Sequence, residues 1–257
     1  MFGILEVVNG GAGRRVAVLS GVKRLGGGRF FVVSTVRCRS GLLWTRRLHR
    51  AVRVFQRAGV GTVIFPAAFD RQALFEKAGV AAAGEETLRR RTAGAAARVL
   101  LAQHGLPAPA CCALLLGDHM SADLRRTLTE LALHVRYTML CAGGGGGEVC
   151  SMLRREYGIS VLREPGAEQL ARARLQLTFG AARPVVPPPC LWLPCGACTA
   201  AEGFENSAPY IQYAVPEPLE ASLGASGAAR NALLSALLEM GTLRPEEVEV
   251  TEIRQNA

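Results

Sequence analysis

The chain has 257 residues, of which 49% are hydrophobic and 20% are charged, and its formal net charge is +9. This composition is typical of a globular protein with a sizeable core. No apolar run approaches the roughly 20 residues that a membrane-spanning helix needs, and Glu6 interrupts the apolar N-terminus, which therefore lacks the pattern of a signal peptide. We expect a cytoplasmic protein without a membrane partner.

Residues 1–106 are expected to form a β-meander followed by a basic α/β region. Strands are predicted at "GILEVV", "RRVAVL" and "RFFVVSTV", joined in succession by the turns "NGGAG" and "GGG". Apolar residues at helical spacing predict a helix from about Leu42 to Arg57. A short strand in "GVGTVIFPAA", a short helix ending at Gly79 and a longer helix ending at Gly105 complete this region.

Positive charge is concentrated in the same region. Residues 1–105 contain 18 Lys+Arg against 5 Asp+Glu, and the remainder contains 12 against 16. Arg46, Arg50, Arg53 and Arg57 recur at helical spacing and form a row on the helix predicted from Leu42. Such a row can follow a nucleic-acid backbone. A solvated helix face is the interpretation that the sequence favours, so nucleic acid is not the expected partner.

Strands and helices alternate regularly over residues 107–183. The strands are "CCALLLG", "VRYTMLCA", "ISVLRE" and "LQLTFG", and the helices between them are "SADLRRTLTELALH", "GEVCSMLRREYG" and "GAEQLARAR". This pattern predicts βαβ units and a Rossmann-like parallel sheet, so the fold class is α/β. Residues 184–257 are expected to form a proline-rich extended strap, irregular chain, and a C-terminal helix and strand.

Five consecutive glycines, Gly143 to Gly147, lie between a predicted strand and a predicted helix. Glycines at such a position permit a tight turn and a close approach of the backbone to a phosphate, which the helix N-terminus also attracts. Glu164 ends the following strand, about 20 residues further on, where an acidic residue would bind ribose hydroxyls. Two registers nearly fit G-x-G-x-x-G, one through Gly143 and Gly146 and the other through Gly144 and Gly147; each lacks its first glycine.

This stretch resembles the dinucleotide-binding βαβ unit of Rossmann dehydrogenases over roughly 30 residues. The resemblance implies a nucleotide-type cofactor, NAD(P), held by Gly143, Gly144, Gly146 and Gly147 together with Glu164. The alternative is a flexible turn in a Rossmann-like fold that binds no dinucleotide.

Asp118 and His119 follow the strand "CCALLLG", at the carboxyl end where open α/β sheets place their ligand sites. Asp118 is therefore expected to line the same crevice as the glycine turn and to contribute to cofactor binding there. Asp118 and His119 are also the best acid–base candidates. The alternative role for Asp118 is to cap the following helix, and Ser121 is the other candidate for that cap.

Cys195 and Cys198 form a C-x-x-C pair after the proline-rich strap. A redox dithiol needs its first cysteine at a helix N-terminus, and a structural zinc site needs four ligands. Neither context is present around this pair, so ordinary thiols and no metal site are expected.

No complete catalytic motif is present, and two hypotheses from different classes remain. The first is a nucleotide-binding α/β protein, which includes an oxidoreductase with a degenerate cofactor turn. The second is a non-enzymatic interaction or regulatory scaffold with a protein partner. The fold cannot choose between them. The sequence identifies neither a substrate nor a reaction.

Overall fold

The computed structural model describes residues 1–9, 18–38, 40–196, 209–224 and 228–254. The chain forms two compact units. Unit 1 comprises residues 1–88 and 215–247, and unit 2 comprises residues 89–214 and 248–257. The domain boundaries expected near residues 106 and 183 stay a prediction. None of the described helices is long and apolar enough to cross a lipid bilayer.

Unit 1 is built around a five-stranded sheet with the strand order β2-β3-β1-β4-β5. Its strands are β1 (Phe2–Asn9), β2 (Val18–Leu25), β3 (Gly28–Arg37), β4 (Thr62–Ile64) and β5 (Ala81–Ala82). Its helices are α1 (Gly41–Arg57), α2 (Gln72–Glu76), α8 (Glu217–Gly224), α9 (Arg230–Glu239) and the 3-10 turn η2 (Pro245–Glu247). A further helix, α3 (Glu86–Arg91), starts in unit 1.

The predicted β-meander is wrong in its pairing. β2 and β3 form an antiparallel hairpin around Gly26 and Gly27, as expected. β1, however, pairs in parallel with β3 on one side and with β4 on the other, so it lies inside the sheet. The adjacent residues Ile4 and Leu5 are both fully buried, and a strand that is apolar on both faces belongs in a sheet interior. Most of the "NGGAG" turn and most of the strand predicted at "RRVAVL" lie outside the described residues.

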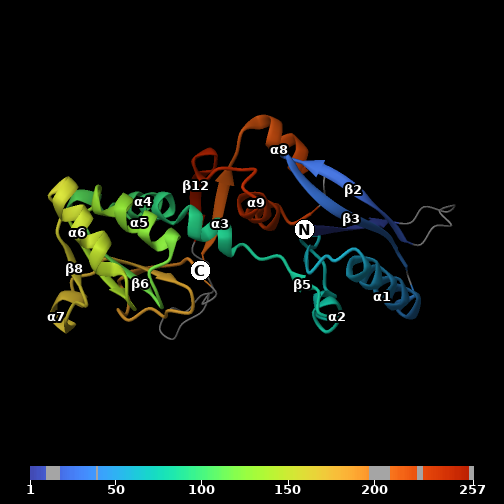
Figure 1. Cartoon of the computed structure of the whole chain (residues 1–257), viewed down its shortest axis with the longest axis horizontal. Helices are drawn as coiled ribbons and strands as arrows, with labels where there is room; N and C mark the ends of the chain where they lie inside the picture. Colours follow the sequence, from blue (N-terminus) through green and yellow to red (C-terminus); the bar gives the residue numbers. More distant parts are fainter. Residues whose placement is uncertain (10–17, 39, 197–208, 225–227, 255–257) are drawn as a thin grey trace. The chain divides into compact units, whose positions relative to one another are not determined.

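Helices cover both faces of the unit 1 sheet (Figure 1). On one face, α1 and α2 pack Phe55 and Phe75 against Val33 in a single apolar cluster. On the other face, Leu237 of α9 lies so close to Gly28 that an added Cβ would be 2.8 Å from its Cδ2 atom. The predicted apolar stripe of α1 is confirmed as its buried side.

Unit 2 is built around a second five-stranded sheet, with the order β10-β9-β6-β7-β8, in which all pairs are parallel. Its strands are β6 (Cys112–Gly117), β7 (Tyr137–Ala142), β8 (Val161–Arg163), β9 (Leu175–Phe179) and β10 (Leu191–Pro194). Its helices are α4 (Ala93–Gln103), the 3-10 turn η1 (Ala108–Ala110), α5 (Ala122–Ala132), α6 (Gly146–Tyr157) and α7 (Ala167–Leu170). A separate antiparallel pair consists of β11 (Tyr210–Ala214) and β12 (Glu249–Arg254).

The strand order of unit 2 is that of a doubly wound sheet. Numbered along the chain, its strands run 3-2-1-4-5, which is the order of a Rossmann-like fold, and the predicted fold class is confirmed. The order reverses at β6, which lies between β7 and β9. Parallel neighbours require long crossovers, and α5, α6 and α7 supply the three between β6 and β9. Helices α4 and α5 lie along one side of this sheet (Figure 1).

Three parts of the expected pattern differ from the structure. The long helix predicted to end at Gly105 is divided at Thr92 into α3 and α4. The proline-rich strap runs into β10, which is the fifth strand of the sheet, and the segment expected to be irregular contains β11 and α8.

A buried glutamine explains how the strap joins the sheet. The Gln176 side chain of β9 accepts hydrogen bonds from the backbone N–H groups of Val185 (3.0 Å) and Val186 (3.1 Å) and donates one to the Val186 carbonyl oxygen. Further along, the Trp192 indole N–H of β10 donates to the Thr178 hydroxyl of β9 at 3.0 Å. These bonds satisfy polar groups that would otherwise be buried without partners.

Candidate functional site

The candidate site lies at the carboxyl edge of the unit 2 sheet. In open α/β sheets, ligands bind outside the carboxyl ends of the strands, near the point where the strand order reverses. In unit 2 this point lies between β6 and β9, and the chain segments that follow β6, β7, β8 and β9 all leave the sheet at this edge. The predicted site residues belong to these segments.

Asp118 links the two strands at the reversal point. Its Oδ2 atom accepts a hydrogen bond of 2.7 Å from the backbone N–H of Ala181, just after β9. Gly180 has a φ of +65°, and a Cβ there would collide with the Asp118 carboxylate. Gly196, after β10, packs in turn on the backbone of Gly180. The carboxylate therefore lies between the ends of β6 and β9, at the point where open α/β sheets usually form their ligand crevice.

Asp118 does not cap α5, which was the alternative role for this residue. The cap is Ser121, whose Oγ atom accepts a hydrogen bond of 3.2 Å from the Leu124 backbone N–H. His119 is exposed, and its backbone oxygen accepts a hydrogen bond from the Ser121 N–H. The Asp118 carboxylate accepts its hydrogen bond from the Ala181 N–H. These contacts give Asp118 a structural partner and do not pair it with His119.

The glycine run is an ordered turn at the end of β7. Gly144 and Gly145 have φ values of +69° and +73°, a left-handed conformation that other residues adopt only with strain. A Cβ on Gly143 would lie 2.6 Å from the Asp118 backbone oxygen, and a Cβ on Gly146 would lie 3.0 Å from the Leu140 Cδ2 atom. The approach at Gly143 needs glycine and the approach at Gly146 is tight, so the run brings α6 close to β7 and places the turn against the loop after β6.

Two arginines flank the first turn of α6. A Cβ on Gly147 would lie 3.0 Å from the Arg163 Nη1 atom, so this guanidinium from the end of β8 lies beside the helix start. Burial raises the pKa of the Cys150 thiol in the next turn, and the positive charge of Arg163 opposes that shift. Arg125 of α5 lies 3.6 Å from the exposed Glu148 carboxylate. The negative charge of Glu148 in the first turn is thus partly offset.

Glu164 lies directly after β8 in a backbone conformation that is rare for glutamate. Its φ is +44°, and its backbone N–H donates to the Leu140 carbonyl oxygen of β7 at 2.9 Å. Its side chain is exposed. Burial is the main cause of the raised pKa of the Cys141 thiol, and the charge of Glu164 adds to it. Glu164 and the glycine turn therefore end two neighbouring strands.

The sequence thus predicted that Asp118, the glycine turn and Glu164 lie at one edge of one sheet. Asp118 approaches Gly143 and Gly180, whereas Glu164 follows β8, on the far side of β7 from Asp118. The sequence-based prediction missed Gly180 and Arg163. Gly180 ends the strand "LQLTFG", and a glycine that ends a buried strand at this edge was the available signal.

The C-x-x-C pair lacks the features of a redox site in the part that the structure describes. Cys195 is fully buried, and this burial raises the pKa of its thiol, whereas a reactive cysteine needs a lowered pKa. Cys198 lies outside the described residues. Among the described residues, no group of three or more His, Cys, Asp or Glu side chains could hold a metal ion.

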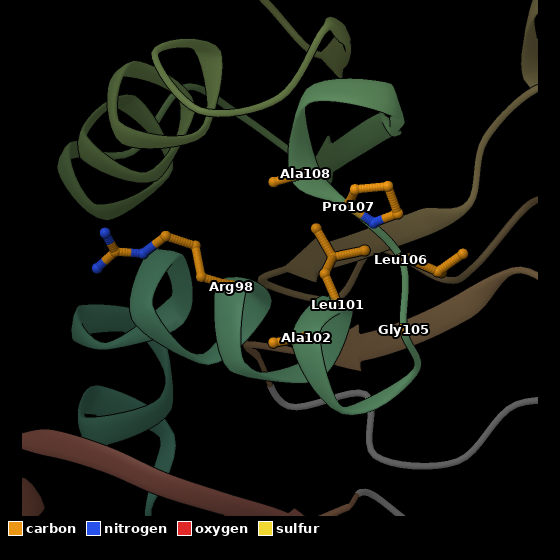
Figure 2. Close-up of a pocket in the computed structure, with 7 residues that line it drawn as sticks. All are labelled: Arg98, Leu101, Ala102, Gly105, Leu106, Pro107 and Ala108. Carbon is orange, nitrogen blue, oxygen red and sulfur yellow. The ribbon is translucent and has the colours of Figure 1, made fainter.

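A pocket of about 460 Å³ lies elsewhere on unit 2, between the end of α4 and η1. Figure 2 shows Leu101 pointing toward Pro107 while Arg98 extends away. Arg98 also forms an ion pair with Glu130, with 3.0 Å between the charged groups. Because η1 leads into the amino end of β6, this pocket lies at the wrong end of the strands for the site that this fold usually forms.

Comparison with known proteins gives no family assignment. No protein-family model matches the chain, and no curated protein matches it significantly. Among solved structures, it is similar to the catalytic subunit of aspartate transcarbamoylase from M. jannaschii, with a TM-score of 0.33, 10% identity, and coverage of 81% of this chain and 77% of that chain. It is also similar to L-tryptophan dehydrogenase from Nostoc punctiforme, with a TM-score of 0.33, 13% identity, and coverage of 84% and 63%.

A third solved structure is Δ1-pyrroline-2-carboxylate reductase from Thermococcus litoralis, in complex with NADH and L-proline. It has a TM-score of 0.33 and 12% identity, and the match covers 66% of this chain and 57% of that chain. The chain thus spans less than two thirds of the length of both the tryptophan dehydrogenase and this reductase. Similarities at this level carry no argument about function, which has to come from the site itself.

Proposed function

We propose that unit 2 binds an anionic ligand of the nucleotide type through the βαβ unit formed by β7, α6 and β8. In this proposal the turn from Gly143 to Gly147 surrounds a phosphate group. The N–H groups at the start of α6 supply hydrogen-bond donors and partial positive charge. Glu164 accepts hydrogen bonds from ribose hydroxyls, and NAD(P) is the cofactor that fits this layout.

The observation that carries the proposal is the position of the glycine turn relative to Glu164. A mononucleotide-binding βαβ unit has its glycine turn after the first strand and its acidic residue after the neighbouring second strand. Here the glycine turn ends β7, Glu164 follows β8, and these strands pair in parallel through Leu140 and Arg163. The positive φ of Glu164 adds support, because strained backbone is concentrated at functional sites.

The site departs from the usual arrangement in one respect. The glycine turn follows the second strand of the sheet, and the turn after the first strand, β6, presents the Asp118 carboxylate instead. A ligand would therefore lie on the β7–β8 side of the reversal point, beside Arg163 and away from the Asp118 carboxylate. The proposal concerns binding and assigns no reaction.

Thermal unfolding of the purified protein with and without millimolar NAD, NADP, ATP or FAD tests this proposal. A ligand present at 100 times its dissociation constant should stabilise the folded protein by about 2.7 kcal/mol. We expect an upward shift for at least one nucleotide and loss of that shift in Gly144→Asp, which places a negative charge in the turn. No other atoms fill the space around Gly144, and Asp tolerates a positive φ better than most residues, so the variant should fold at the cost of some backbone strain.

Gly158→Asp is the matched control. Gly158 has the same φ of +69°, has no atoms close to an added Cβ, and ends α6 at its opposite terminus. It should keep the nucleotide shift. Equal loss in both variants, or a shift that survives in Gly144→Asp, would refute binding at the glycine turn.

The scaffold hypothesis is the second candidate function. It is favoured by the bond between Asp118 and Ala181, which fills the position between β6 and β9 with a protein carboxylate. It predicts no thermal shift with any of the four nucleotides, and chemical crosslinking should then capture a protein partner.

A further inference from the structure

A strong charge asymmetry in unit 1 has no role in the function proposed above. Between Glu6 and Asp70 the sequence contains twelve Lys and Arg residues and no Asp or Glu. Five of the twelve belong to α1, which has no acidic residue of its own. So long a segment without carboxylates leaves its basic side chains without acidic neighbours in sequence.

The outer side of α1 presents four of these arginines in one row, which we call the arginine face: Arg46, Arg50, Arg53 and Arg57. All four are exposed. The first and last are eleven positions apart, or roughly 16 Å at the rise of an α-helix. Arg47 is not part of the face, because it donates a hydrogen bond of 2.8 Å to the Val36 carbonyl oxygen.

Several arginines elsewhere in the chain have acidic partners, and the members of the arginine face have none among the described residues. In unit 2, Arg90, Arg98 and Arg125 each lie within 4.0 Å of a carboxylate. In unit 1, Arg230 forms a close pair with Glu220. Within the residues that the structure describes, no member of the arginine face forms such a pair. Four neighbouring guanidinium groups repel one another, so an anionic partner would be stabilised there.

We propose that the arginine face of α1 binds the phosphodiester backbone of double-stranded nucleic acid without reading its sequence. Guanidinium groups bind phosphate oxygens through paired hydrogen bonds. A row of four along a rigid helix suits a linear array of phosphates. Contacts to phosphates supply affinity but carry no base information.

Two features favour a duplex over other polyanions. Proteins that bind single strands stack bases on aromatic side chains, and both aromatic residues of α1, Trp44 and Phe55, are buried in the core. A helix that lies on a membrane inserts its apolar side into lipid, but the apolar side of α1 packs against the sheet of unit 1. Only Leu42 and Leu43, in the first turn, are exposed apolar residues on this helix.

Fluorescence anisotropy with two labelled DNA duplexes of unrelated sequence, using the full-length protein, tests the proposal. Four phosphate contacts predict a slope of about −3.6 for log K against log salt, or about a 150-fold loss of affinity between about 50 and 200 mM salt. Arg50→Gln/Arg53→Gln should reduce this loss to about 12-fold, because two contacts remain. Both duplexes should bind equally well.

Arg172→Gln/Arg183→Gln is the control, since it removes the same charge from two exposed residues of unit 2. It should leave the slope unchanged. Arg46→Gln/Arg57→Gln should reproduce the effect of the first pair, which guards against misfolding of one variant. Equal losses in the control, a slope near zero, or no binding to either duplex would overturn the proposal. Binding to phosphatidylserine vesicles without duplex binding would overturn it in favour of a membrane.

Discussion

At the scale of single residues, one buried amide decides whether the proline-rich segment stays on the unit 2 sheet. Gln176 is completely buried, and its three hydrogen bonds to the backbone of Val185 and Val186 leave none of its polar atoms unused. Gln176→Ala would leave these backbone groups without partners. We expect it to lower the free energy of unfolding of unit 2 by about 3 kcal/mol, since each unsatisfied buried group costs about 1–3 kcal/mol.

The two tryptophans of the chain let each unit be followed separately, because Trp44 lies in unit 1 and Trp192 in unit 2. In a Trp44→Phe background, Trp192 emission should report urea unfolding of unit 2. The matched control is Gln103→Ala, at an exposed glutamine of α4, which should change stability by less than about 0.5 kcal/mol. Equal midpoints for Gln176→Ala and this control would contradict the assigned role.

We expect two buried thiols to make the stability of unit 2 sensitive to alkaline pH. Burial raises the pKa of Cys190 from an ordinary 9.0 to about 12, and burial also raises the pKa of Cys195. Because the pKa of Cys190 is higher in the folded state than in the unfolded state, its contribution to stability is complete below about pH 9 and is lost as the pH rises toward 12. We expect the urea midpoint reported by Trp192 to fall between about pH 9 and pH 11.

The Cys190→Ala variant isolates this contribution. It removes the ionisable group from a site that is 5% exposed, so its midpoint should depend less on pH over the same range. An identical pH dependence in the parent and the variant would show that the Cys190 thiol is not responsible. Reduced protein should be used throughout, since the described cysteines are all free thiols.

At the scale of elements, local patterns identified most strands and helices but not their partners. The turn before β2 favoured a hairpin with β1, yet β1 pairs with β3 because Ile4 and Leu5 require cover on both faces. The prolines before β10 concealed a strand whose pairing depends on Gln176 and Thr178. In each case the deciding interaction joins residues that are distant in sequence, which periodicity does not record.

The candidate site likewise combines features that local patterns predict with a contact that they do not. Regular βα alternation placed Gly143 to Gly147 and Glu164 at the carboxyl ends of neighbouring strands, so their position could be predicted. The bond from Asp118 to Ala181 could not, because 63 residues separate its partners and no local motif marks it. Local reasoning therefore locates the edge of the sheet but does not reveal that a side chain occupies part of it.

At the scale of the whole molecule, unit 1 is assembled from two distant segments of the chain. Residues 1–88 provide all five strands of its sheet, and residues 215–247 provide α8 and α9. Leu237 of α9 is fully buried and lies against Gly26 and Gly28 of the hairpin between β2 and β3. The sheet formed by the N-terminal segment should therefore depend on a helix near the C-terminus for its stability.

Leu237→Ala tests this dependence. Truncating a buried leucine costs about 2–5 kcal/mol through lost burial and the cavity that remains. We expect the free energy of unfolding obtained from Trp44 emission in urea, in a Trp192→Phe background, to fall by an amount in that range, with a lower urea midpoint. The exposed Leu133 of unit 2 provides the control Leu133→Ala, which should leave the Trp44 midpoint unchanged. A Trp44 midpoint unaffected by Leu237→Ala would show that the strands of unit 1 are stable without this contact. If the Trp192 midpoint, measured in the Trp44→Phe background, falls together with it, the two units unfold as one cooperative structure.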